Sequence, residues 1–160
     1  MRRRLLNVLL TLYMGNILFA QEPKLMLPIG HTGSVINANF SPDGKRMATA
    51  TQEVPASEDG AVKIWDVTTG SLLLDLRDEK EIMHDARFSP DNKRIVTVTG
   101  YGQPKIWDIY TGQLLFTLLG HTGYIYSAEY SPDGKYLVTC SGDSTAKIWE
   151  EETGRILWNL

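Results

Sequence analysis

"SPDGKYLVTCSGDSTAKIWE", residues 131–150, is the third appearance of one phrase in this chain of 160 residues. The second copy, "SPDNKRIVTVTGYGQPKIWD", occupies residues 89–108, and the first opens with "SPDGKRMATA" at residues 41–50. The tryptophans near the ends of the copies are 42 residues apart, at Trp65, Trp107 and Trp149. A constant period of this length is typical of proteins built from one repeated supersecondary unit.

The first copy is longer than the other two. Its first residue, Ser41, lies 48 residues before Ser89, whereas Ser89 lies 42 residues before Ser131. The six extra residues fall within "TQEVPASE", residues 51–58, because the phrase resumes with "AVKIWD" at residues 61–66. Stretches that contain proline, serine and charged residues between two strand-like runs are typical of loops. We therefore expect an insertion loop inside the first unit.

Each unit divides into four short runs with the composition of β-strands. In the third unit these runs are "YIYSAEY", "YLVTC", "TAKIW" and "RILWNL", and "SPDGK", "SGDS" and "EETG" separate them. In "SPDG" the proline fixes φ, the aspartate bonds to nearby backbone and the glycine takes a positive φ. Asn92 replaces this glycine in the middle copy, and asparagine is comparatively tolerant of positive φ. The sequence predicts a four-stranded antiparallel meander in each unit, with strands a to d.

The chain resembles the WD40-repeat β-propeller family. The resemblance rests on "GH" at residues 30–31 and 120–121, on "SPDG" ten residues after each of these histidines, and on "IWD" at residues 64–66 and 106–108. In that family each four-stranded repeat is one blade of a propeller. The resemblance therefore implies an all-β, WD40-like β-propeller segment of three four-stranded antiparallel blades, arranged as an incomplete or open ring.

The repeats are expected to fill residues 21–160. Their expected extents are residues 24–27 for an orphan outer strand, residues 30–76 for blade 1, residues 77–118 for blade 2 and residues 120–160 for blade 3. Propellers typically have four to eight blades. Three blades therefore need either self-association, for example as two three-bladed halves, or further blades of a longer protein. The apolar end at "ILWNL" favours the longer protein, because an uncapped strand edge is a liability.

The resemblance also implies a buried hydrogen-bond chain of tryptophan, threonine, histidine and aspartate within a blade. The matching residues are Trp65, Thr49, His31 and Asp59 in the first unit, and Trp149, Thr139, His121 and Asp143 in the third. An indole N–H only donates, whereas a threonine hydroxyl donates and accepts, so such a chain is chemically coherent. The middle unit keeps only Thr97 and Trp107, because Glu79 and Tyr101 replace its histidine and aspartate. We expect its blade to be held mainly by apolar packing and to be the least rigid.

A catalytic interpretation of these residues is less favoured. His121 and Asp143 could act as a pair on Thr139 or Cys140, but the same set recurs in the first unit, and active sites are seldom duplicated in this way. The sequence has no glycine-rich phosphate loop, no G-x-S-x-G elbow and no Cys/His metal spacing. "TGRILW" at residues 153–158 resembles a turn-and-tryptophan phrase of quinone-cofactor dehydrogenase propellers, but the other copies lack the tryptophan. We expect no enzymatic activity, no cofactor and no metal.

The irregular parts of the repeats gather at one predicted end of the blades. In a meander the d–a and b–c connections share one end, and there lie the insertion loop, "RDEKE" at residues 77–81 and "GYGQ" at residues 100–103. Variation confined to one rim is typical of a binding face, although loops also tolerate change without function. The candidate partner-binding residues are Glu53, Pro55, Glu58, Asp78, Glu79, Lys80 and Tyr101.

Residues 1–20 differ from the rest of the chain. "MRRR" is basic, and the run from Leu5 to Ala20 is mostly apolar. This pattern predicts a signal peptide cleaved after Ala20 and a secreted or periplasmic protein. A membrane anchor is the alternative, but the run is sixteen residues long, whereas a span needs about twenty. We expect no stable membrane insertion of the mature chain.

The charge balance argues against one class of partner. Removal of residues 1–20 takes away three arginines and no acids, which leaves 13 basic and 19 acidic side chains. Such a chain has no electrostatic footprint for nucleic acid. The predicted function is a non-enzymatic exported scaffold for protein or ligand binding. The alternatives are a purely structural module that orients a missing effector domain and, more remotely, a quinone-cofactor oxidoreductase.

Overall fold

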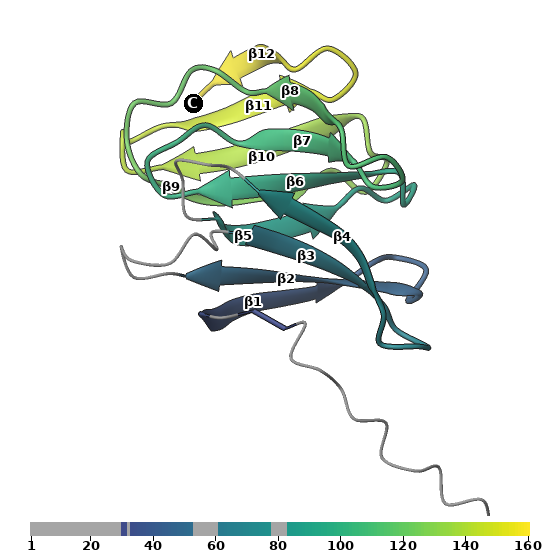
Figure 1. The fold of residues 1–160 in the computed structure, drawn as a ribbon. Helices are drawn as coiled ribbons and strands as arrows, with labels where there is room; N and C mark the ends of the chain where they lie inside the picture. The colour runs from purple at the N-terminus through teal and green to yellow at the C-terminus, as the bar shows by residue number, and fades with distance from the viewer. Residues whose placement is uncertain (1–29, 32, 53–60, 78–82) are drawn as a thin grey trace, which may run out of the picture.

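The computed structural model of this chain describes residues 30–31, 33–52, 61–77 and 83–160 (Figure 1). All twelve regular elements in these ranges are β-strands. No helix there is long and apolar enough to cross a membrane. The strands form three sheets of four, and consecutive strands pair antiparallel. The prediction of an all-β chain with three four-stranded antiparallel units is confirmed.

We call the three sheets blades 1, 2 and 3. Blade 1 comprises β1 (Ser34–Phe40), β2 (Arg46–Gln52), β3 (Ala61–Asp66) and β4 (Leu72–Arg77). Blade 2 comprises β5 (Met83–Phe88), β6 (Arg94–Thr99), β7 (Lys105–Asp108) and β8 (Leu114–Thr117). Blade 3 comprises β9 (Ile125–Tyr130), β10 (Tyr136–Ser141), β11 (Ala146–Glu150) and β12 (Arg155–Asn159). The expected signal peptide, the outer strand at residues 24–27 and most of the insertion loop lie outside the described residues.

The "SPD" turns close the first hairpin of each blade in the same way. In blade 1 the amide of Gly44 donates to the carbonyl of Ser41, and the Ser41 hydroxyl donates to Asp43 Oδ1 at 2.6 Å. Gly44 has φ of 69° and Asn92 has φ of 59°. The prediction that asparagine replaces glycine in the same left-handed conformation is therefore confirmed.

The blades stack through two apolar cores, one on each face of blade 2. The core between blades 1 and 2 is built from Ala48, Ala50, Val62, Ile64, Leu76, Met83, Ala86, Phe88, Ile95, Trp107 and Ile109. The core between blades 2 and 3 is built from Val96, Val98, Ile106, Leu118, Ile125, Ala128, Tyr130, Leu137 and Trp149. Neighbouring residues of β6 contribute to opposite cores, since successive side chains of a strand point to opposite faces. Because its side chains alternate between the two faces, blade 2 packs against blade 1 on one face and against blade 3 on the other.

The stack does not close into a ring. Blade 2 lies between the other two blades, and contacts between blades run mainly through β5 and β9 (Figure 1). Among the described strands, none covers the outer face of blade 1 or the outer face of blade 3. The expectation of an open ring is confirmed.

Candidate partner-binding face

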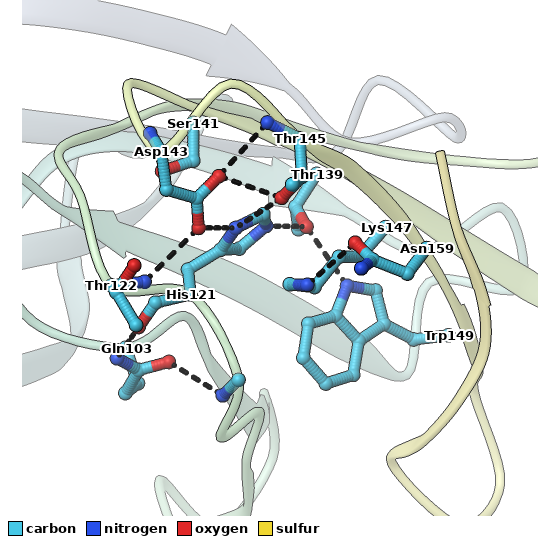
Figure 2. Close-up of polar contacts among 11 residues, drawn as sticks. Gln103, His121, Thr122, Thr139, Ser141, Asp143, Thr145, Lys147, Trp149 and Asn159 are labelled. Atoms are coloured by element: carbon cyan, nitrogen blue, oxygen red, sulfur yellow. Dashed lines mark hydrogen bonds and ion pairs between the residues drawn. The ribbon is translucent and has the colours of Figure 1, made fainter.

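A continuous hydrogen-bond chain crosses the interior of blade 3 (Figure 2). The indole N–H of Trp149 donates to Thr139 Oγ1 at 2.8 Å, and His121 Nε2 lies 2.7 Å from the same oxygen. His121 Nδ1 lies 2.8 Å from Asp143 Oδ2. A carboxylate only accepts, so Nδ1 carries a proton. In the neutral imidazole Nε2 then accepts from the Thr139 hydroxyl, which gives every polar atom of the chain a partner.

Asp143 ties two connections of blade 3 together. Its Oδ2 accepts from the backbone N–H of Thr122, and its Oδ1 accepts from the hydroxyl and the N–H of Thr145. The Thr145 hydroxyl, the Thr122 amide and His121 hold the pKa of Asp143 well below its ordinary value. Gly123 permits the close approach, because a Cβ there would lie 2.5 Å from the Asp143 nitrogen. The carboxylate is therefore saturated with donors and ionised.

Blade 1 repeats part of this chain. The indole N–H of Trp65 donates to Thr49 Oγ1 at 2.7 Å, and His31 Nε2 lies 2.6 Å from that oxygen. Lys63 Nζ donates to the carbonyl of Gly30 at 3.1 Å. Asp59, the expected fourth member, lies outside the described residues. The structure thus brings three of the four expected residues of blade 1 together.

Blade 2 has the shortest version of the chain. Trp107 donates to Thr97 Oγ1 at 2.9 Å, and both side chains are buried. Tyr101, which replaces the aspartate, is 83% exposed. Glu79, which replaces the histidine, lies outside the described residues. The middle blade therefore has an exposed aromatic ring where blade 3 has a half-buried acid.

Gln103 bridges blade 2 to blade 3, a contact that sequence reasoning missed. Its side-chain N–H donates to the carbonyl of His121 at 2.8 Å, and its oxygen accepts from the N–H of Gly120 at 3.1 Å (Figure 2). The side-chain amide of Gln103 thus bonds to one backbone N–H and one backbone carbonyl of the segment that precedes β9. This contact fixes the connection between β6 and β7 against the connection that leads into β9.

Four aromatic rings gather beside this bridge. Tyr124 lies at the centre, with ring centroids 5.3 Å from Tyr101, His84 and Tyr126. Tyr101 meets Tyr124 edge to face, while His84 stacks on it with an interplanar angle of 26°. Tyr101 and Tyr126 are exposed, at 83% and 59%. We call these four side chains the aromatic platform.

Glycine makes room for the platform. A Cβ at Gly100 would lie 2.5 Å from the ring of Tyr124, so a larger residue would displace that ring. The N–H of Ile125 donates to the carbonyl of Gly100 at 2.9 Å and joins the two blades here. The platform therefore sits on a backbone that is itself hydrogen-bonded across the blade junction.

The structure places one member of the expected binding rim. Tyr101 lies in the connection between β6 and β7, at the expected end of the blade. The other six candidates lie outside the described residues: Glu53, Pro55, Glu58, Asp78, Glu79 and Lys80. Tyr124, Tyr126 and His84 were missed, although "YIY" at residues 124–126 shows that its two tyrosines share one face of a strand.

The opposite end of blades 2 and 3 carries a charged cleft of about 560 Å³. It lies between their "SPD" turns and is lined by Ser89, Asp91, Lys93, Arg94, Asp133, Gly134, Lys135, Tyr136, Glu150, Glu151 and Glu152. Arg94 and Glu151 form an ion pair within it. In the described ranges no three His, Cys, Asp or Glu side chains are placed to hold a metal ion.

Comparison with known proteins gives one family match. The WD40 model, described as "WD domain, G-beta repeat", matches residues 22–66 and 112–150, which together make up more than half of the chain. The two matches leave out most of the middle repeat, in which Glu79 and Tyr101 depart from the pattern.

Individual relatives match shorter segments. The serine-threonine kinase receptor-associated protein of Dictyostelium discoideum is 38% identical over 68 residues, which are 42% of this chain and 21% of that protein. The human WD repeat and SOCS box-containing protein 1 is 51% identical over 37 residues, which are 23% of this chain and 9% of that protein. The chain thus spans about a fifth of the length of the first of these curated relatives and about a tenth of the second.

A solved structure matches more of the chain. The crystal structure of the computationally designed Ika8 protein aligns with a TM-score of 0.69 and 28% identity. The alignment covers 82% of this chain and 38% of the designed chain.

Proposed function

The chain belongs to the WD40 family, and from this premise we propose that it is a non-enzymatic scaffold that binds a protein partner. WD40 repeats serve generally as protein-interaction modules, and the human relative above is by name a WD-repeat protein. His121 of blade 3 supports the non-enzymatic part, because it is buried and both of its ring nitrogens bond within the blade, to Thr139 and Asp143.

The aromatic platform is the observation that carries the proposal. Tyrosine presents a large contact area with little loss of side-chain entropy, and it is enriched among the residues that dominate binding energy. Here Tyr124 is packed between three other rings, while Tyr101 and Tyr126 remain exposed. A preorganised ring cluster of this kind binds with a smaller ordering cost than a mobile loop.

A displayed peptide library selected on the purified protein tests the proposal. We expect the enriched peptides to lose at least tenfold in affinity for the Tyr101→Ala variant, as at a binding hot spot. Tyr110→Ala is the matched control. Tyr110 is 62% exposed, follows β7 at the other end of blade 2 and contacts the guanidinium of Arg46.

Two outcomes contradict the proposal. Peptides that bind wild type and Tyr101→Ala equally well place the binding surface elsewhere. A library that enriches no peptide on a folded chain favours the structural module that orients another domain.

We further propose that residues 1–20 direct export and are removed after Ala20. The basic start and the apolar run of sixteen residues support this. Expression in a bacterium, followed by mass measurement of the periplasmic protein, should give a chain that begins at Gln21. A full-length chain retained in the membrane fraction would show an anchor instead.

A further inference from the structure

The outer blades each present an uncovered apolar face. On blade 1 this face contains Val35, Phe40 and Val67, which are 52%, 66% and 45% exposed. We call it the blade 1 face. On blade 3 it contains Val138, Trp158 and Leu160, which are 42%, 64% and 69% exposed, and we call it the blade 3 face. The two faces lie at opposite ends of the stack (Figure 1).

The blade 1 face consists of positions that the repeat buries elsewhere. Phe40 stands in the same register as Phe88 and Tyr130, at spacings of 48 and 42 residues. These three rings are 66%, 8% and 7% exposed. Phe88 is covered by blade 1 and Tyr130 by blade 2. In the described part of the chain no blade covers Phe40, although the equivalent rings in blades 2 and 3 are buried against the preceding blade.

The blade 3 face shows the complementary pattern. Leu76, Leu118 and Leu160 share one register position and are 3%, 0% and 69% exposed. Val96 is fully buried, whereas its counterpart Val138 is 42% exposed. Leu76 is covered by blade 2 and Leu118 by blade 3. The blade 3 face is thus equivalent to the surfaces that already receive a following blade.

We propose that a second copy of this chain docks head to tail, with the blade 3 face of one copy against the blade 1 face of the other. The contact continues the two blade junctions that already exist within the chain. Such a contact joins two different surfaces, and it forms a closed ring when the rotation between subunits allows. Two copies supply six blades, which is within the range of closed propellers.

The polar edge of the junction fits this arrangement. Between blades 2 and 3, Arg94 pairs with Glu151. The counterparts of these residues at the new junction are Tyr136 on blade 3 and Val67 on blade 1, which are 44% and 45% exposed. An ion pair is thus replaced by a tyrosine and a valine, and no charge at this position is buried without a partner. In the alternative dimer, two blade 1 faces would pack against each other. No junction within the chain has that geometry.

A pair of variants tests the proposal by mixing. Phe40→Glu places a charge on the blade 1 face, and Trp158→Lys places one on the blade 3 face. Both side chains are mostly exposed, so each variant should keep its own fold, which circular dichroism checks. Tyr110→Ala, which lies on neither face, is the control.

Light scattering after size-exclusion chromatography gives the readout. We expect the full chain and the control to have twice the chain mass of 18.0 kDa, and each single variant to be monomeric at the same concentration. An equimolar mixture of the two variants should regain the double mass, because one junction between intact faces remains. Association through residues 1–20 would persist in both single variants, which would overturn the proposal.

Three further results would overturn the proposal. A monomeric wild-type chain shows that another segment or another partner covers the faces. If only one single variant dissociates, two identical faces pair. If both variants dissociate but their mixture stays monomeric, the contact is not head to tail.

Discussion

At the scale of single residues, a threonine hydroxyl accepts from the tryptophan in every blade, and the blades differ in whether a histidine also bonds to it. Thr139 Oγ1 serves both Trp149 and His121, whereas Thr97 Oγ1 serves Trp107 among the described residues. Both threonines are buried. A buried donor that loses its acceptor costs about 1–3 kcal/mol.

We therefore expect Thr139→Val to lower the free energy of unfolding by about 3 kcal/mol, and Thr97→Val by about 1.5 kcal/mol. The shape of the side chain is nearly the same in both variants, so the difference reports the number of hydrogen bonds lost. Urea unfolding followed by circular dichroism measures it. Equal losses at the two positions would mean that the bond to His121 contributes nothing.

The sequence predicted the described members of the hydrogen-bond chains in blades 1 and 3, because each type of side chain has a limited set of donors and acceptors and the repeat supplied the register. It did not predict Gln103, whose partners are backbone atoms of the next blade. It also missed Tyr124 and His84, which meet only after two blades have packed. Contacts within a unit follow from the repeat, whereas contacts between units depend on the angle and offset of packing.

At the scale of elements, the central strands of blade 2 have the shortest hydrogen-bond chain, but their aliphatic side chains are fully buried. Ile95, Val96, Val98 and Ile106 have no exposed surface, and they face two different cores. Each buried side chain of this kind contributes about 1.5–3 kcal/mol, whereas a hydrogen bond contributes about 1 kcal/mol. Burial therefore outweighs the loss of the histidine and aspartate.

We expect β6 and β7 to exchange their amide hydrogens more slowly than β2, β3, β10 and β11. This reverses the expectation from sequence that blade 2 is the least rigid. Hydrogen exchange detected by mass spectrometry on the monomeric Phe40→Glu variant measures it, since the outer faces are then open. If β6 and β7 exchange fastest, blade 2 is the least rigid blade, as expected from the sequence. The hydrogen-bond chain then contributes more to rigidity than apolar burial does.

Strands and turns were predictable because their signals are local. Alternating apolar residues, "SPDG" and the recurring tryptophan fixed the strand order, and the turn conformations of Gly44 and Asn92 agree with it. The distribution of exposure was less predictable. Phe40 and Phe88 have the same side chain and register, and only the presence of a neighbouring blade separates their burial.

At the scale of the whole molecule, stability is coupled to whatever covers the two outer faces. A partner that binds only the folded state raises the midpoint of thermal unfolding, and for self-association this midpoint depends on protein concentration. If head-to-tail docking occurs, we expect Tm to rise with protein concentration for the wild-type chain. Trp158→Lys should unfold at one temperature over the same range, as scanning calorimetry can show.

The aromatic platform draws its rings from two blades, and this shared origin has a consequence for recognition. His84 and Tyr101 come from blade 2, whereas Tyr124 and Tyr126 come from blade 3. Neither blade alone displays the composite epitope. A ligand that contacts all four rings would therefore bind only chains in which blades 2 and 3 are folded and packed together. It would not bind a partly synthesised chain or one in which either blade is unfolded.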